Sequence, residues 1–330
     1  MIKIIITGGH LTPALALLEK LEKEKDHEIY FFGRKYAAED SANFSAEYKL
    51  LTKTSINFVN ITTGRLQRKF TRYTILSLAK IPVGFVQSFV YLAKIRPNII
   101  VSFGGYLSLP VVFAGWLLGI NSITHEQASI PGLATKINSL FARKVFLTWP
   151  KSKKYFDSSS RHPDKVLVIG NLTRQSIFKK NAKDSKINNF TKTGKVIFVT
   201  GGNLGSHFLN TQVFELIEKL KNYKIVHQVG ATNYKGDLDH ARRVKKSNYL
   251  ALDYLDSYNI GAVLNRADLI ISRSGANTVW DLAILAKVAI LVPLQISAAG
   301  EQLENAKILE TAGSAEVIYQ KDCTQDRLLI

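Results

Sequence analysis

The chain begins two of its segments in the same way, and this repetition constrains the fold more than any other feature. Ile4-Ile5-Ile6 runs directly into Thr7-Gly8-Gly9, and Val196-Ile197-Phe198-Val199 runs into Thr200-Gly201-Gly202. An apolar strand that ends in glycines and is followed by a helix is typical of the first βα unit of a Rossmann-like domain. The 330 residues are enough for two such domains of about 150 residues each.

Short apolar runs, each followed by a turn, recur along both halves, and helical stretches such as Ala14–Glu24 and Leu209–Lys221 separate many of them. The runs are Ile2–Ile6, Ile29–Phe32, Ile99–Val101, Val145–Leu147, Val166–Ile169, Val196–Val199, Ile225–Val229, Leu269–Ile271 and Ala289–Val292. Such a pattern favours α/β domains whose parallel sheets are covered on both faces. We expect domains at residues 1–169 and 170–330, a loop at Lys179–Lys195, and a ligand in the cleft between the domains, beyond the carboxyl ends of the strands.

Four glycine-rich turns follow these strands, namely Thr7–His10, Phe103–Tyr106, Gly201–Ser206 and Arg273–Thr278. Glycine lets the backbone approach a phosphate closely, and the N-terminus of the next helix offers free N–H groups. A single turn of this kind is weak evidence, but four turns spread over both halves favour a phosphorylated ligand. None of the four ends in Gly-Lys-Ser/Thr or reads Gly-x-Gly-x-x-Gly, which argues against an ATP P-loop and against an NAD site.

The charge balance indicates an anionic partner, because 44 Lys and Arg residues face 26 Asp and Glu residues and the net charge is +18. No acid lies between Glu47 and Glu126, where bases stand beside aromatic and apolar residues. This pattern is typical of interfacial binding to anionic lipid, although we expect part of the apolar run to be core. A nucleic-acid partner would explain the charge but not the glycine turns. The membrane-facing residues that we expect are Arg65, Arg68, Lys69, Arg72, Ile75, Lys80, Phe85 and Trp116.

The sequence lacks the usual marks of secretion and of metal binding. The first apolar run is too short for a signal peptide, and no run reaches the roughly 18 apolar residues of a spanning helix. Cys323 is the single cysteine, which excludes a disulfide framework and a thiolate metal cluster. The one Asp-x-Asp, Asp237-Leu238-Asp239, is expected to be a solvated helix start. We therefore expect a cytoplasmic protein with peripheral membrane contact and no metal or other cofactor.

An ordered set of motifs now makes the chain resemble a known family. They are Gly8-Gly9-His10-Leu11-Thr12-Pro13-Ala14-Leu15-Ala16, Ser102-Phe103-Gly104-Gly105-Tyr106, His125-Glu126-Gln127, Gly170-Asn171-Leu172-Thr173-Arg174, Gly201-Gly202-Asn203-Leu204-Gly205, Ser272-Arg273-Ser274-Gly275-Ala276-Asn277-Thr278 and Gln302 with Asn305-Ala306. In this order they resemble the MurG family of bacterial N-acetylglucosaminyltransferases, which have the GT-B fold. The resemblance covers about residues 1–319.

The resemblance implies a reaction at the cytoplasmic face of the cell membrane. N-acetylglucosamine would move from UDP to the 4-hydroxyl of muramic acid on an undecaprenyl-diphosphate lipid, with inversion to a β-1,4 link. An inverting transfer needs a base for the acceptor hydroxyl, and histidine titrates near neutrality. His10 is the first candidate base, and His125 and Glu126 are the others. Thr7, Gly8, Gly9, Gly104, Gly105 and Tyr106 would bind the acceptor.

The resemblance also implies a donor site in the second half. Arg174 would hold the diphosphate, and a guanidinium can do so by paired hydrogen bonds. Gly202, Asn203 and Ser206 would lie at the same diphosphate, and Leu255 would receive uracil through its backbone. Asp281 would grip the ribose hydroxyls. Gln302 would contact the sugar, beside Ser274, Gly275, Ala276 and Asn277.

The chain departs from the family pattern at several positions. The first family loop reads Gly-Gly-Gly-Thr-Gly-Gly-His, so Thr7–His10 forms a shorter loop. Ala128 replaces a family asparagine, Asn203-Leu204 replaces Ser-Gln, and Asp281 replaces a glutamate. Family members end with a helix that returns to the first domain, and we expect that helix to be missing because the chain stops at Ile330.

Two alternatives stay open at this point. The first is a GT-B enzyme with another acceptor or chemistry, such as a glycolipid synthase or a UDP-sugar epimerase. The second is a sugar-nucleotide-binding homologue without catalysis, which the shortened first loop would favour. Turnover without a muramyl acceptor would support the epimerase, and UDP binding without transfer would support the non-catalytic protein.

Overall fold

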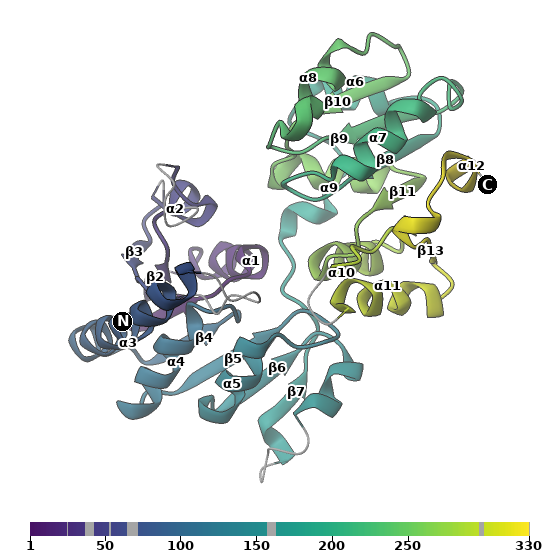
Figure 1. Ribbon diagram of the computed structural model, residues 1–330. Coiled ribbons are helices and arrows are strands. Elements are labelled where there is room, and N and C mark those ends of the chain that lie inside the picture. Colours follow the sequence, from purple (N-terminus) through teal and green to yellow (C-terminus); the bar gives the residue numbers. More distant parts are fainter. Residues whose placement is uncertain are drawn as a thin grey trace. The chain divides into compact units, whose positions relative to one another are not determined.

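The computed structural model describes residues 1–24, 26–36, 43–52, 54–64, 72–156, 163–296 and 300–329, with the backbone alone described at 72–78 and 163. The chain divides into two compact units, Met1–Leu172 and Thr173–Ile330 (Figure 1). The sequence placed the boundary between residues 169 and 170. Each unit is an α/β domain built on one parallel sheet, so the expected fold class is confirmed.

The first unit has a seven-stranded sheet in the order β3-β2-β1-β4-β5-β6-β7. Its strands are β1 (Ile2–Thr7), β2 (His27–Gly33), β3 (Asn57–Asn60), β4 (Ile99–Ser102), β5 (Ser122–Glu126), β6 (Lys144–Leu147) and β7 (Val166–Val168). Its helices are α1 (Leu11–Leu21), α2 (Ala46–Leu51), α3 (Arg72–Ile95), α4 (Ser108–Leu117) and α5 (Leu133–Phe141), with 3-10 turns at Pro150–Tyr155 and Pro163–Lys165.

The second unit has a six-stranded sheet in the order β10-β9-β8-β11-β12-β13. Its strands are β8 (Val196–Thr200), β9 (Lys224–Gln228), β10 (Tyr249–Leu252), β11 (Leu269–Ser272), β12 (Ala289–Leu291) and β13 (Ala315–Val317). Its helices are α6 (Ser185–Thr191), α7 (His207–Leu216), α8 (Asp237–Arg243), α9 (Ser257–Arg266), α10 (Ala276–Ile284), α11 (Glu301–Thr311) and α12 (Gln325–Leu329), with 3-10 turns at Gln175–Phe178, Tyr234–Gly236 and Gln320–Asp322.

The central strands contain continuous apolar runs because helices cover both faces of the sheet. In β1, Ile4 and Ile6 pack with Leu18 of α1 on one face, whereas Ile5 packs with Leu92 of α3 and Val111 of α4 on the other. Successive side chains of a strand point to opposite faces, so a strand between two helical layers needs apolar residues at every position.

The two sheets share one topology, and this places the glycine turns. In both units the first strand pairs with the second on one side and with the fourth on the other, so the strand order reverses at β1/β4 and at β8/β11. Thr7 pairs with Ser102 in the first unit, and Thr200 pairs with Ser272 in the second. Each pair of strands ends in two of the four predicted turns, and such a reversal is where open α/β sheets bind ligands.

The structure also differs from the sequence analysis. Lys179–Lys195 is not all loop, because α6 begins where the Asp184 side chain accepts a hydrogen bond from the Lys186 N–H and caps a helix. The apolar runs did not reveal β3, β5, β10 and β13. β5 is central but reads Ser-Ile-Thr-His-Glu, so it has no apolar run. Each of the other three short strands pairs with one neighbour, at the edge of its sheet. An edge strand needs less apolar surface than a central one, so its sequence signal is weaker.

Candidate functional site

The first two glycine turns form one compact edge of unit 1. The Gly9 N–H donates to the Gly104 carbonyl oxygen over 2.8 Å. A Cβ atom added to Gly105 would lie 2.7 Å from the Gly9 nitrogen and Cα, so a side chain would push the turns apart. Gly104 and Gly105 also have positive φ angles of 69° and 76°. The contact between the turns therefore requires glycine whether or not a ligand lies there.

His10 presents one free ring nitrogen at this edge. Its Nδ1 lies 3.0 Å from the Phe103 carbonyl oxygen. A carbonyl oxygen only accepts, so Nδ1 carries the proton and the neutral ring keeps its lone pair on Nε2. His10 occupies the N-cap position of α1 but makes no capping hydrogen bond, and its side chain is exposed. The ring is thus held in the tautomer that a general base requires.

His125 lacks a free ring nitrogen. It is one of the last two residues of β5, where the sequence analysis placed it after a strand. Its Nε2 donates to the Gly170 carbonyl oxygen over 2.9 Å, and its Nδ1 accepts from the Gln127 side-chain amide over 3.1 Å. Burial lowers the pKa of His125 to about 4. A neutral ring with both nitrogens engaged orders this part of the unit and cannot take a proton from an acceptor without losing a bond.

Glu126 is also engaged by its own turn. One carboxylate oxygen accepts from the Ala128 N–H over 3.0 Å and the other from the Gly132 N–H over 3.1 Å. The side chain is buried, and Gly132 is the N-cap residue of α5. Glu126 therefore holds the chain between β5 and α5. Of the three candidate bases, His10 alone offers an exposed atom that the described structure leaves unoccupied.

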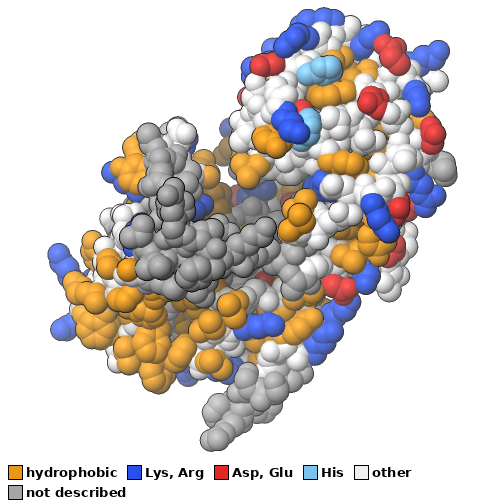
Figure 2. Space-filling view, viewed as in Figure 1, with side chains coloured by type: hydrophobic (Ala, Val, Ile, Leu, Met, Phe, Trp, Pro, Cys, Tyr) orange, Lys and Arg blue, Asp and Glu red, His pale blue; other side chains and the backbone are white. Residues whose placement is uncertain are grey.

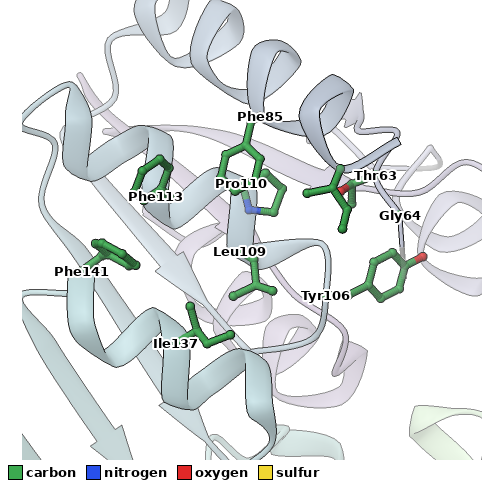
Figure 3. A pocket seen from close by; sticks show the side chains of 10 residues that line it. Thr63, Gly64, Phe85, Tyr106, Leu109, Pro110, Phe113, Ile137 and Phe141 are labelled. Carbon is green, nitrogen blue, oxygen red and sulfur yellow. The ribbon is translucent and has the colours of Figure 1, made fainter. Parts of the chain in front are cut away.

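Tyr106 links the second glycine turn to an apolar pocket of about 350 Å³ between α3, α4 and α5. Figure 3 shows Phe85 from α3, Phe113 from α4 and Phe141 from α5 around this pocket. The Phe85 and Phe113 rings meet edge to face at 5.3 Å between centroids, and those of Phe113 and Phe141 at 5.0 Å. A pocket lined in this way accepts apolar groups.

Exposed apolar side chains continue outside the pocket on α3 and α4. We call Val86, Phe89, Val90, Trp116 and Leu117 the apolar surface, and their exposed fractions range from 42% to 64%. Figure 2 shows hydrophobic side chains gathered over this part of unit 1. A contiguous patch of this kind marks an interaction site more often than isolated exposed residues do.

The other expected membrane residues have mixed positions. Lys80 and Phe85 are half-buried and Leu92 is core, so part of the α3 run is core, as expected. Arg65, Arg68 and Lys69 lie outside the described residues, and Arg72 and Ile75 are described by backbone alone. In the described chain, no helix combines the length and the apolar character that crossing a bilayer requires.

The third and fourth glycine turns meet at a polar pocket of about 570 Å³ in unit 2. We call it the polar pocket, and its lining is Gly201, Gly205, Ser206, His207, Phe208, Tyr234, Arg273, Leu294, Gln302 and Gln320. Ser206 and Gln302, expected at the diphosphate and at the sugar, thus line one space. Gly202 and Asn203 belong to the same turn, and Gly202 has a φ of 86° with open space where a Cβ would be.

Arg273 is a residue of this pocket that the sequence analysis did not single out. Its Nε and Nη2 donate to Ser206 Oγ over 3.1 and 3.0 Å, and Nη1 donates to the Val292 carbonyl oxygen over 3.0 Å. Nη2 also donates to Gln320 over 2.7 Å. The guanidinium is buried and joins the two turns. Arg273 belongs to the Ser272–Thr278 motif, so the sequence could have marked it as a candidate. Its hydrogen-bond partners lie far away in the sequence and are seen only in the fold.

Asp281 and Arg174 form a second polar position in unit 2. Asp281 is half-buried on α10, and burial raises its pKa to about 7 while the Arg174 charge opposes the rise. Trp280, its neighbour on the helix, donates to Thr173 Oγ over 2.8 Å and so ties α10 to the start of the unit. This carboxyl changes its charge near neutral pH, which is uncommon for aspartate.

The remaining expected donor residues surround the start of α10 and the end of β10. Ser274 is buried and donates to the Gln302 carbonyl oxygen over 2.8 Å, while the Gln302 side-chain oxygen accepts from the Leu294 N–H over 2.9 Å. Gly275 is the N-cap of α10, where Ala276 and Asn277 begin the helix without a side-chain cap. Leu255 is buried in the segment after β10.

The expected solvated helix start at Asp237 is wrong in one respect. Asp237 begins α8, as expected, but its carboxylate is buried. One oxygen accepts from His207 Nδ1 over 2.8 Å and the other from the Asn210 amide over 2.8 Å. These two partners on α7 replace solvent, whereas Asp239 remains exposed.

Comparison with known families and relatives gives one consistent answer. The glycosyltransferase family 28 N-terminal domain matches residues 2–147, and the C-terminal domain of the same family matches residues 196–329. A Treponema denticola protein is 33% identical over 97% of this chain and 83% of its own length. A Clostridium perfringens protein is 34% identical over 99% of this chain and 88% of its own length. Both carry the name UDP-N-acetylglucosamine--N-acetylmuramyl-(pentapeptide) pyrophosphoryl-undecaprenol N-acetylglucosamine transferase.

Solved structures support the fold. Acinetobacter baumannii MurG has a TM-score of 0.69 and 22% identity, over 99% of this chain and 88% of that one. UDP-GlcNAc 2-epimerase from Neisseria meningitidis, solved with UDP-GlcNAc, has a TM-score of 0.67 and 15% identity, over 100% of this chain and 89% of that one. At these identities the structures establish the two-domain fold but do not distinguish a transferase from an epimerase. The sequence relatives at 33% and 34% identity carry the transferase name.

Proposed function

Because the chain belongs to the MurG family of N-acetylglucosaminyltransferases, we propose that it transfers N-acetylglucosamine from UDP-N-acetylglucosamine to a muramoyl peptide on an undecaprenyl-diphosphate lipid. The geometric observation that carries the proposal is His10, which is exposed where two glycine turns meet and whose tautomer leaves the Nε2 lone pair without a partner among the described residues. The proposed reaction forms a β-1,4 link with inversion.

In the proposed mechanism His10 Nε2 accepts the proton of the acceptor 4-hydroxyl as its oxygen attacks the anomeric carbon. The bond between that carbon and the β-phosphate oxygen breaks, and its electron pair leaves with UDP. A base that is already in the correct tautomer lowers the barrier, because no proton has to be rearranged first. The phosphate charge is then stabilised by backbone N–H groups and by Arg174.

For the donor, we assign Ser206, Gly202 and Asn203 to the diphosphate and Gln302 to the sugar, because Ser206 and Gln302 line one polar pocket. Ser274, Gly275, Ala276 and Asn277 bring the α10 N-terminus beside that pocket. Asp281 is assigned to the ribose and Leu255 to the uracil by resemblance. Arg273 holds the Ser206 turn in position.

For the acceptor, we assign Thr7, Gly8, Gly9, Gly104, Gly105 and Tyr106 to the lipid diphosphate. Tyr106 lines the apolar pocket together with Phe85 and Phe113, and these two rings also border the apolar surface. A protein at the cytoplasmic face of an anionic membrane would place apolar surface and bases against the bilayer, where its acceptor resides.

The binding of UDP-N-acetylglucosamine is expected to weaken about 10-fold between pH 8 and pH 5.5. Asp281, with a pKa of about 7, is ionised at the higher pH and protonated at the lower one, and the ionised carboxylate is the better acceptor for ribose hydroxyls. Calorimetry across this range checks the expectation. The sugar nucleotide is preferable to UDP because UDP has a terminal phosphate that itself titrates near pH 6.

Two variants isolate this carboxyl. Asp281→Asn should remove this weakening at low pH, since the amide does not titrate. Arg174→Ala should weaken binding and move the midpoint above pH 7, because the Arg174 charge holds the Asp281 pKa down. A wild-type affinity that stays constant with pH, or an equal dependence in Asp281→Asn, would remove Asp281 from the ribose site.

Val86→Asp is expected to reduce binding to vesicles that contain anionic lipid by about 10-fold. The change removes apolar contact from the apolar surface and adds a charge that anionic headgroups repel. Sedimentation with vesicles of anionic and neutral lipid measures the effect. Val288→Asp is a matched control, because Val288 is exposed to a similar degree in unit 2. Equal loss in the two variants, or equal binding to neutral vesicles, would contradict this orientation.

A further inference from the structure

A chain of four hydrogen bonds runs through unit 2 and ends at the polar pocket. Tyr249 donates to His227 Nδ1 over 2.8 Å, and His227 Nε2 donates to Asn210 Oδ1 over 3.0 Å. Asn210 Nδ2 donates to Asp237 over 2.8 Å, and His207 Nδ1 donates to the other Asp237 oxygen over 2.8 Å. All of these side chains are largely buried except that of His207, which is 33% exposed.

The direction of every bond in this chain is fixed. Asn210 Nδ2 also donates to the Val229 carbonyl oxygen over 3.0 Å, so its amide oxygen must face His227. His227 then donates through Nε2 and accepts through Nδ1, which is the pattern of a neutral ring. Burial lowers the pKa of His227 to about 3 and raises that of Tyr249, so neither group changes charge near neutral pH. These hydrogen bonds therefore hold the Asn210 amide as a fixed donor to one Asp237 oxygen.

The His207 ring lines the polar pocket together with Ser206, Arg273 and Gln302. It is the first residue of α7, and its ring meets that of Tyr234 edge to face at 5.7 Å. Asp237 engages Nδ1, and no hydrogen bond to Nε2 is found within the described part of the chain. Among the described residues that line this pocket, the charged or titratable side chains are cationic or basic apart from the Tyr234 phenol. The pocket is therefore suited to an anion.

We propose that His207 binds a phosphate oxygen of the donor diphosphate through Nε2–H, as an imidazolium held in place by Asp237. This inference rests on the proposed function, because it assigns the diphosphate of that donor to the polar pocket. Asp237 compensates the charge of the ring on one side and the phosphate does so on the other. When the bond to the anomeric carbon breaks, the electron pair goes to the β-phosphate oxygen. The His207 proton stays on Nε2 and stabilises the new charge by a hydrogen bond.

His207→Asn is the sharpest variant for this proposal. The asparagine amide reaches the place of Nδ1 and can still donate to Asp237, so the buried carboxylate keeps a partner, but nothing replaces Nε2. We expect UDP to bind about 10-fold more weakly while uridine, which has no phosphate, binds unchanged. His207→Gln places an amide nitrogen near the position of Nε2 and should recover part of the loss.

The control is His240→Asn, which changes an exposed histidine of α8 in the same unit. Calorimetry and competition titrations give the ratio of uridine to UDP dissociation constants for each protein, and thermal melting shows that each is folded. In the wild type, the Nε2 resonance of ¹⁵N-labelled His207 should shift when UDP is added and stay in place with uridine. A histidine that only holds Asp237 would show neither the selective loss nor the shift.

The outcomes separate the two claims. If the wild-type protein binds neither UDP nor uridine, the proposed function fails. If the wild type prefers UDP to uridine and folded His207→Asn keeps the same ratio, the proposed function stands and the assignment of His207 is overturned. Equal losses for UDP and uridine in His207→Asn would also overturn it, because they would indicate a general change of the unit.

Discussion

Replacing His10 with alanine is expected to lower kcat for sugar transfer by about 10²–10⁴-fold, the usual contribution of a positioned general base. The Nδ1–H bond to Phe103 fixes the tautomer with Nε2 available, and no other candidate base offers an exposed free atom in the described structure. Donor affinity should change much less than kcat, because the residues assigned to the diphosphate, ribose and uracil belong to unit 2. Steady-state transfer rates together with UDP-N-acetylglucosamine calorimetry measure both quantities.

A second histidine tests whether this effect is specific. His125→Gln removes the bonds from His125 to Gly170 and Gln127, and we expect a loss of about 1–3 kcal/mol in the free energy of unfolding. The kcat of the folded fraction should stay within a few-fold of the wild type. The opposite result would be a folded His125→Gln that loses transfer activity and a His10→Ala that keeps it. That result would assign the base to His125 instead of His10.

Gly205→Ala is expected to lower the free energy of unfolding by about 3 kcal/mol and to weaken donor binding at least 100-fold. Gly205 has a φ of 83°, and an added Cβ would lie 2.0 Å from the Val229 carbonyl oxygen. Left-handed backbone alone costs a non-glycine residue about 1–2 kcal/mol, and a clash with backbone must displace the whole turn. Because Ser206 follows directly, its position in the polar pocket should be lost with the turn. Urea unfolding and donor calorimetry check the two effects.

Gly202→Ala is the matched control within the same turn. Gly202 has a similar φ of 86°, but a Cβ would meet nothing within 4 Å. We therefore expect only the conformational cost of about 1–2 kcal/mol. If Gly202→Ala also weakened donor binding, the cause would be the added methyl group, which would keep the diphosphate away from the backbone of the turn. Equal stability of Gly205→Ala and the wild type would show that the turn can relax, contrary to the expected displacement.

Much of the fold could be predicted because it depends on local pattern. Central strands such as β1 and β8 are covered on both faces, so each contains a continuous apolar run, Ile4–Ile6 and Val196–Val199, which is followed by Thr-Gly-Gly. The edge strands β3, β10 and β13 are short and carry a weaker signal, and α6 depends on the single cap at Asp184. Local sequence thus revealed the architecture, while elements with few apolar residues needed tertiary contacts.

The candidate site was predictable by residue type but not by hydrogen-bond state. The motifs made His10 the first candidate base and kept His125 and Glu126 beside it. Only contacts between distant segments show that, within the described residues, His10 alone of the three keeps an unoccupied atom. Asp237 read as solvated because its partners on α7 lie about thirty positions earlier in the chain. Arg273 was part of a motif but had no predicted role, although its guanidinium bonds to both Ser206 and the Val292 carbonyl oxygen. Such pairings depend on strand order, which no local pattern encodes.

The measurement that tests the central claim most directly is transfer of labelled N-acetylglucosamine from UDP to a synthetic lipid-linked muramoyl peptide in anionic vesicles. The account predicts a β-1,4-linked disaccharide on the lipid, formed only with the muramoyl acceptor present, and its near absence with His10→Ala. Conversion of the sugar nucleotide without acceptor would instead indicate an epimerase. UDP binding with no labelled lipid product, in wild type and His10→Ala alike, would contradict the claim that this chain is a transferase.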